Sequence, residues 1–217
     1  AQAQRTALRF LAADGSATDL TYAELKRRTD AFANALTGLG VGAGDRVFVL
    51  AGRMPALYVA VLGALKNGSV VTPLFSAFGP EPIATRMAIG QARVLVTTAA
   101  LYRRKIEKIR AQLPALEHVI VVGDDPDRDG GDAPPGTHDY AALMRSAPQG
   151  APEIRTRGED MALLHFTSGT TGTPKGAVHV HEAVLTHYAT GYYALDLHDD
   201  DVFWCTADPG WVTGTSY

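Results

Sequence analysis

Cysteine is nearly absent from this sequence, since Cys205 is the only one among 217 residues. A single thiol excludes an internal disulfide and any metal centre that is built from several thiolates. Long apolar runs are also missing: no stretch approaches the roughly 20 residues that span a bilayer, and the opening residues AQAQRTALRF hold no apolar signal-peptide core. These absences predict a soluble, cytoplasmic protein with no membrane partner.

Basic charge is not in excess either. The chain has 20 Lys and Arg against 23 Asp and Glu, with a formal net charge of -3. Nucleic-acid binding therefore gains no support from the overall charge, because neutralising a phosphate backbone needs an excess of basic side chains. A hydrophobic content of 46% with 20% charged residues predicts a globular chain with a buried core.

Predicted helices and strands alternate along most of the chain. The capping-box spacing of Thr21 and Glu24 opens a predicted helix from Tyr22 to about Leu39. Further helices are predicted at 55–66, 82–89, 99–112 and 182–195, and strands at 46–50, 69–74, 92–97, 118–122, 161–166 and 202–206. This alternation is typical of repeated βαβ units, so the predicted fold class is α/β with a mainly parallel sheet.

A polar segment interrupts this alternation. Residues 124–136 concentrate Asp, Gly and Pro, which predicts an exposed loop. We place a candidate subdomain boundary near 124–158, between the first series of βαβ units and the block that opens with the apolar strand at 161–166.

One loop concentrates groups that hold phosphate. Residues 167–176 read TSGTTGTPKG, directly after an apolar strand. Its glycines let the backbone approach a ligand closely, its hydroxyl groups add donors, and Lys175 adds positive charge. It is not a Walker A loop, because Lys175 follows Pro174 and precedes Gly176. An ordinary surface turn is the alternative, and this density of functional groups argues against it.

The loop resembles the signature phosphate loop of the adenylate-forming, or AMP-binding, superfamily, which includes acyl-CoA synthetases, luciferases and nonribosomal-peptide adenylation domains. The resemblance implies that the chain is part of the large N-terminal domain of such an enzyme. It also implies ATP with Mg²⁺ as a substrate, CoA as a cosubstrate and a catalytic role for Lys175. The residues that it assigns to the ATP phosphates are Thr167, Ser168, Gly169, Thr170, Thr171, Gly172, Thr173 and Lys175.

A second motif narrows the substrate. Residues 204–214, WCTADPGWVTG, resemble the motif that follows the phosphate loop in acetyl-CoA synthetases, and residues 179–182 resemble the same short-chain branch. In those enzymes the positions of Trp211, Val212 and Thr213 border the acyl pocket, so the resemblance implies a small carboxylate, acetate before others. A bulky indole that closes an apolar pocket leaves space only for a small acyl group. An ordinary core position is the alternative for Trp211.

Two further groups of side chains have patterns that ligand sites also use. Arg103 and Arg104 fall where this family places cationic residues near the CoA nucleotide, with a solvated helix face as the alternative. Four residues suggest metal ligands, but the polarity and capping of a helix start explain them more simply, and no metal site is predicted. They are His179, His181, Glu182 and His187.

The resemblance implies a reaction in two steps. A small carboxylate attacks the α-phosphate of ATP to give acyl-AMP and pyrophosphate, and the CoA thiol then attacks the acyl carbon to give acyl-CoA and AMP. Residues 1–217 are expected to be an incomplete N-terminal domain without the small C-terminal domain, and to lack ligase activity alone. Two alternatives stay open: an adenylation enzyme that loads a carrier protein, and a noncatalytic nucleotide-binding module.

Overall fold

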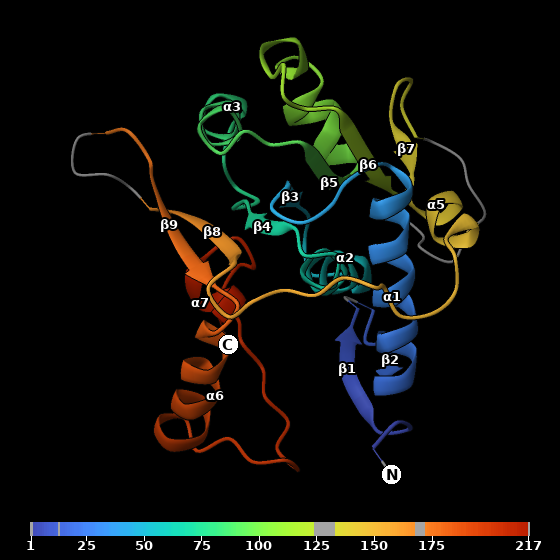
Figure 1. Cartoon of the computed structure of the whole chain (residues 1–217), viewed down its shortest axis with the longest axis vertical. Helices are drawn as coiled ribbons and strands as arrows, with labels where there is room; N and C mark the ends of the chain where they lie inside the picture. The colour runs from blue at the N-terminus through green and yellow to red at the C-terminus, as the bar shows by residue number, and fades with distance from the viewer. Residues whose placement is uncertain (1, 13, 124–132, 168–171, 217) are drawn as a thin grey trace.

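The main body of the molecule is a mostly parallel sheet. The computed structural model describes residues 2–12, 14–123, 133–167 and 172–216 (Figure 1). Within these residues the sheet has seven strands in the order β7-β6-β5-β3-β4-β8-β9, and only β8 and β9 pair antiparallel. The strands are β3 (Arg46–Leu50), β4 (Val70–Pro73), β5 (Val94–Thr98), β6 (His118–Val122), β7 (His138–Asp139), β8 (Met161–Thr167) and β9 (Lys175–Val180).

Helices cover both faces of this sheet (Figure 1). On one face, α1 (Tyr22–Gly38), α2 (Pro55–Lys66) and α5 (Tyr140–Ser146) pack over Val47 and Val49. On the other face, α3 (Pro80–Ile89) and residues 99–113 pack over Phe48 and Leu50. Successive side chains of β3 thus enter opposite cores, as the two-residue period of a strand requires. A parallel sheet that is buried on both faces confirms the predicted α/β class.

An antiparallel hairpin stands apart from this sheet. It consists of β1 (Thr6–Leu11) and β2 (Ala17–Thr21), and it leads directly into α1. At that junction the Glu24 amide donates a hydrogen bond of 3.2 Å to Thr21 Oγ1, which confirms the predicted helix start. The hairpin itself was not predicted, because most of its side chains are exposed and supply little apolar pattern.

Two predicted elements differ from the structure. The helix expected at 99–112 consists of α4 (Ala99–Leu101), a π-helical turn η1 (Tyr102–Ile106) and a 3-10 turn η2 (Arg110–Gln112). The strand expected at 202–206 is wrong, because that segment has no regular structure and the side chain of Val202 is 94% exposed. An apolar run alone does not supply the backbone hydrogen-bond partners that a strand needs.

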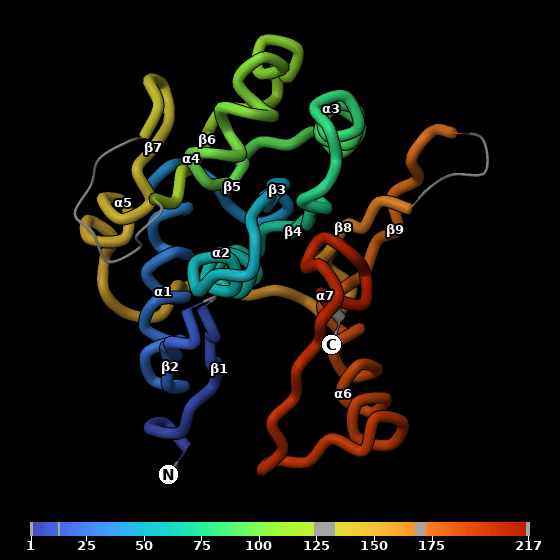
Figure 2. Tube along the Cα trace, turned by 180° about the vertical axis from the view of Figure 1, so that it is seen from behind, coloured from blue at the N-terminus to red at the C-terminus, as the bar shows by residue number. Residues whose placement is uncertain are grey.

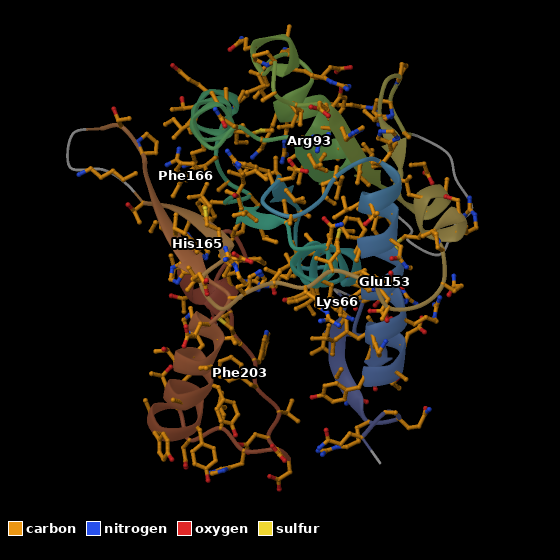
Figure 3. The ribbon with its side chains drawn as sticks, in the orientation of Figure 1. Lys66, Arg93, Glu153, His165, Phe166 and Phe203 are labelled. Atoms are coloured by element: carbon orange, nitrogen blue, oxygen red, sulfur yellow. The ribbon has the colours of Figure 1, made fainter. Side chains whose placement is uncertain are left out.

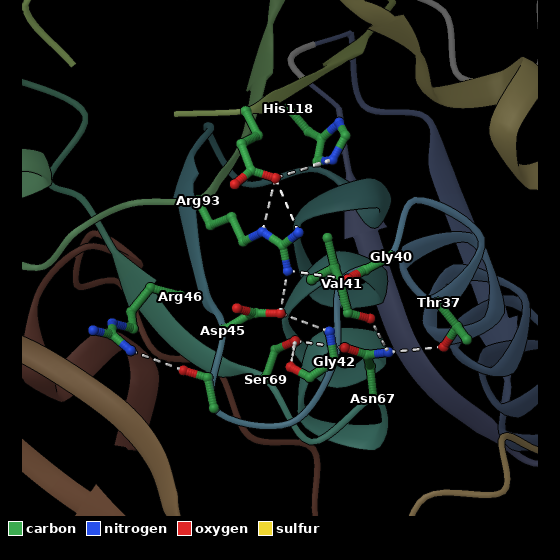
Figure 4. A network of polar contacts seen from close by, with 12 residues as sticks. Thr37, Gly40, Val41, Gly42, Asp45, Arg46, Asn67, Ser69, Arg93 and His118 are labelled. Carbon is green, nitrogen blue, oxygen red and sulfur yellow. Dashed lines mark hydrogen bonds and ion pairs between the residues drawn. The ribbon is translucent and has the colours of Figure 1, made fainter. Parts of the chain in front are cut away.

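A polar network ties together the amino ends of the strands (Figure 4). Arg93, which precedes β5, donates 2.6 Å and 3.0 Å hydrogen bonds to Asp45, before β3, and to Glu117, before β6. Next to them, the buried amide of Asn67 accepts a hydrogen bond of 2.5 Å from Ser69, just before β4. Because parallel strands share their amino ends, the network organises one edge of the sheet. In open α/β sheets, ligands generally bind at the opposite, carboxyl edge.

One sheet continues across the segment of the candidate boundary. β7 pairs with β6, α5 contacts α1, and β8 then pairs with β4. Residues 124–132 of that segment lie outside the described part of the chain, and the boundary stays a prediction. Among the helices that the structure describes, none is both long and apolar enough to cross a bilayer.

Candidate functional site

Several candidate residues follow the carboxyl ends of strands in the sheet. β4 ends just before Phe75, and β8 ends at Thr167. The connections after these two neighbouring strands leave in opposite directions, because the chain crosses past β3 to β5 after β4 but moves outward to β9 after β8. Open α/β sheets bind ligands beyond the carboxyl ends of the strands at such a switch point. The topology therefore marks the space between the ends of β4 and β8.

The β8–β9 hairpin carries the predicted phosphate loop. Its register pairs Thr167 with Lys175, and Thr167 Oγ1 lies 3.5 Å from the Lys175 carbonyl oxygen that accepts its hydrogen bond. Gly172 has a φ of 84°, in the left-handed region that glycine adopts without strain. The side chains of Thr173 and Lys175 are exposed, so both are accessible to a ligand. Ser168, Gly169, Thr170 and Thr171 lie outside the described residues.

The predicted acyl-pocket residues lie near the end of β4. Trp211 packs on Phe75 with ring centroids 5.3 Å apart, and 53% of Trp211 is exposed, so it is not a core residue in this structure. Val212 and Thr213 are also exposed and begin α7 (Val212–Ser216). Both views of the chain place α7 beside β8 (Figures 1 and 2). The contact with Phe75 thus places Trp211 just beyond the carboxyl end of β4.

Hydrogen bonds dock the segment before Trp211 on the sheet. Arg53, after β3, donates to the carbonyl oxygens of Thr206 and, at 2.7 Å, of Ala207. Ser76 Oγ donates a hydrogen bond of 2.7 Å to Asp208 Oδ2. Sequence reasoning missed this role of Asp208, although the Asp-Pro-Gly order indicated a turn that an aspartate side chain organises.

The basic group at 103–105 divides between solvent and the interior. Arg103 and Arg104 are exposed on η1, whereas Lys105 is buried. The Lys105 ammonium donates hydrogen bonds to the carbonyl oxygens of Ser76 and, at 2.7 Å, of Phe78. The turn at residues 75–78 therefore joins the Trp211 segment to η1. Within the described part of the chain, no hydrogen bond or ion pair connects either of them with the Lys175 side chain.

A buried imidazole belongs to the β8–β9 hairpin itself. His165 on β8 is 2% exposed, its Nε2 has no hydrogen-bond partner among the described residues, and its ring meets His179 edge-on at 5.6 Å (Figure 3). Burial, together with His179 and His187, lowers the pKa of His165 to about 4. Across the described residues, no group of three or more His, Cys, Asp and Glu side chains is arranged to hold a metal ion.

Known proteins resemble this chain over its whole length. The family model described as AMP-binding enzyme matches residues 1–217. The acetyl-coenzyme A synthetase of Bacillus subtilis (strain 168) is 44% identical over 203 residues, which cover 91% of this chain and 33% of that relative. The acetyl-coenzyme A synthetase of Rubrobacter xylanophilus is 37% identical over 216 residues, 94% of this chain and 33% of that protein. The chain therefore spans about a third of the length of these curated relatives.

Two solved structures of CoA ligases also resemble this chain. An acyl-CoA synthetase from Brucella canis superposes with a TM-score of 0.87 at 33% identity, over 99% of this chain and 38% of that one. An anthranilate CoA ligase in complex with anthranoyl-AMP gives a TM-score of 0.85 at 27% identity, again over 99% of this chain and 38% of the other.

Proposed function

The chain belongs to the AMP-binding enzyme family, and from this premise we propose that it is the N-terminal part of an AMP-forming acyl-CoA synthetase for a small carboxylate. The observation that carries the proposal is the β8–β9 hairpin, which presents an exposed Lys175 at the carboxyl edge of a parallel sheet. The family resemblance of the loop supports ATP with Mg²⁺ as the first substrate.

The proposed first step is the transfer of AMP to the carboxylate. A carboxylate oxygen attacks the α-phosphorus of ATP, the bond to the bridging oxygen breaks, and pyrophosphate leaves with its negative charge. Lys175 and the hydroxyl groups of Thr167 and Thr173 would lower the energy of that charge as it develops, an effect worth several kcal/mol at comparable sites. The same proposal includes the loop residues outside the described part of the chain, Ser168, Gly169, Thr170, Thr171, together with Gly172.

The proposed second step forms the thioester. The CoA thiolate attacks the acyl carbon of acyl-AMP, and AMP leaves on its phosphate oxygen. The exposed guanidinium groups of Arg103 and Arg104 suit the phosphates of the CoA nucleotide, because guanidinium binds phosphate through paired hydrogen bonds. The single cysteine of the chain supports a cytoplasmic location for this chemistry.

Acetate is the proposed carboxylate. Trp211 with Phe75 packed against it offers an apolar wall, and Val212 and Thr213 follow at the start of α7. A methylene group contributes roughly 1 to 3 kcal/mol to discrimination in an apolar pocket, so propionate is the closest competitor. The names of the curated relatives given above support the same substrate.

Isotope exchange between ATP and pyrophosphate tests this function. The measurement uses the full-length protein that carries this chain, with acetate, propionate, butyrate and benzoate, followed by CoA-dependent release of AMP. We expect exchange with acetate above the other acids and stoichiometric acyl-CoA. Absence of exchange with every acid would favour a noncatalytic nucleotide-binding module, and exchange without CoA turnover would favour loading of a carrier protein. The isolated 217-residue chain is expected to be inactive in both assays.

A further inference from the structure

The turn at residues 75–78 contacts the Trp211 segment through three different groups. The Phe75 ring packs on Trp211, the Ser76 hydroxyl donates to Asp208, and the Phe75 backbone lies against Gly210. Asp208 in turn accepts hydrogen bonds from the amides of Gly210 at 2.7 Å and Trp211 at 2.9 Å, through its side chain and its carbonyl respectively. A shift of the 75–78 turn would therefore move Trp211.

Lys105 holds this turn from the other side. Lys105 is 8% exposed, and its ammonium donates to the carbonyl oxygens of Ser76 and Phe78, which flank the tip of the turn. The π-helical geometry of η1, marked by the hydrogen bond from the Glu107 amide to the Tyr102 carbonyl, accompanies this inward position of Lys105. π-helical turns inside helices are frequent at functional sites.

The charge of Lys105 is costly for a purely structural residue. Its partners are two neutral carbonyl groups, and it makes no ion pair within the described part of the chain. Burying an ammonium without a carboxylate partner is unfavourable, and an apolar side chain of similar length would fill the same volume at less cost. The ammonium fixes the conformation of the 75–78 turn, because it binds the carbonyl oxygens of Ser76 and Phe78 at one point.

We propose that Lys105 is a positioning residue that sets the size of the acyl pocket, by fixing the 75–78 turn against Trp211. The proposal rests on the proposed function for its substrate class. Lys105 does not touch the acyl group itself. It acts through Phe75 and Ser76, and it links the wall of the pocket to the same helical turn that carries Arg103 and Arg104.

Kinetics of the full-length protein test the proposal. In Lys105→Met the 75–78 turn loses the two hydrogen bonds from the ammonium. We expect kcat/KM for acetate to fall about tenfold, as for a lost charged hydrogen bond. Most of this change should be a higher KM for acetate. The preference for acetate over propionate should shrink, while the KM for ATP stays within about twofold. Lys105→Arg should restore part of the preference, because guanidinium can donate to both carbonyls. Lys108→Met, an exposed lysine on the same segment, is the matched control and should behave as wild type.

A spectroscopic readout separates positioning from a loss of activity. With 5-fluorotryptophan in place of tryptophan, and the Trp211 resonance assigned by Trp211→Phe, Lys105→Met should shift that ¹⁹F resonance and Lys108→Met should not. Ser76→Ala removes only the hydrogen bond to Asp208 and should shift the Trp211 resonance in the same direction. This variant replaces Lys105→Met in the test if Lys105→Met does not fold.

Two results would overturn the inference. One is an unchanged Trp211 resonance in both Lys105→Met and Ser76→Ala, and the other is an equal loss of kcat/KM for all carboxylates with the acetate preference intact. Failure of the proposed function is a different outcome, because the wild-type protein would then form no acyl-CoA from any acid. The Trp211 resonance would still report whether Lys105 positions the segment.

Discussion

Gly210 lies so close to Phe75 that a β-carbon at position 210 would come within 2.3 Å of the Phe75 Cα atom. The obstacle is backbone and not the end of a flexible side chain, so either the 206–211 segment or the end of β4 would have to move. The glycine of the Asp-Pro-Gly turn is thus required by close approach of two backbones, and a residue with a side chain there separates Trp211 from the sheet.

Substitution of this glycine should be costly. We expect Gly210→Ala to lower the free energy of unfolding by about 1 to 3 kcal/mol, as overpacking does, in urea titrations of the full-length protein. Gly38→Ala is the matched control, since a β-carbon at Gly38 meets nothing within 4 Å at the last residue of α1. It should be neutral or slightly stabilising. Equal stability of the two variants would contradict the observed docking.

Loss of the Lys175 charge should affect chemistry and not folding. Lys175 is exposed on β9, so Lys175→Ala should leave the urea midpoint unchanged. Exchange of pyrophosphate into ATP should fall about 100- to 1000-fold, the usual effect of removing one group that stabilises developing charge. Lys108→Ala removes an exposed lysine elsewhere and should retain exchange. Exchange by Lys175→Ala within about threefold of wild type would remove Lys175 from the proposed mechanism.

The buried imidazole of His165 should make stability depend on pH in acid. Its pKa is lowered from 6.5 to about 4 in the folded protein, so between these values the unfolded chain binds a proton that the folded chain does not. Stability should therefore be unaffected above pH 6.5 and should decrease as the pH falls toward 4, by at most about 3 kcal/mol. Urea unfolding at several pH values measures this slope.

His165→Phe provides the test of that assignment. A phenyl ring fills the site without a titrating nitrogen, so the variant should lose the slope between pH 6.5 and 4 that is due to this residue. His198→Phe changes a partly exposed histidine on the segment after α6 and should keep the wild-type slope. A slope that persists in His165→Phe would assign the acid sensitivity to other groups.

Exposed apolar side chains on and after α6 (Ala183–Ala194) should bind a hydrophobic dye. Gly191 is the one buried residue among those described on this helix, and the large apolar residues there are open to solvent. Phe203, on the segment after the helix, is also exposed (Figure 3). Apolar patches of this kind on an isolated chain bind dyes and promote association. The exposed residues are Val184, Leu185, Tyr188, Tyr192, Tyr193, Leu195, Val202, Phe203 and Trp204.

Fluorescence of anilinonaphthalene sulfonate with the isolated 217-residue chain measures that surface. The emission should rise strongly with the wild-type chain, and Leu185→Gln combined with Tyr193→Ser should reduce it by about half, because these residues supply part of the patch. Tyr22→Ser removes a single exposed tyrosine on α1 and should have no effect. Equal emission from the wild-type chain and the double variant would contradict binding at α6.

Local sequence patterns were sufficient to predict several helices and strands. The predicted helix at 55–66 and the predicted strands at 46–50 and 118–122 have the observed bounds, because each combines a continuous apolar pattern with a clear turn at both ends. Residues 202–206 have the apolar pattern without a strand, and residues 175–180 form β9 with mostly exposed side chains. Residues 175–180 form a strand because they pair with β8, so pairing and not apolar composition decides between these two segments.

The sequence by itself determined the α/β class and located the candidate phosphate loop, because hydrophobic period and the order of glycine, hydroxyl and lysine residues are local properties. Only the tertiary structure decided which neighbours of a motif act together. It buries Lys105 and exposes Arg103 and Arg104, and it joins Ser76 to Asp208 across 132 residues of chain. Such contacts join segments that are far apart in the sequence, and no local propensity records which segments become neighbours.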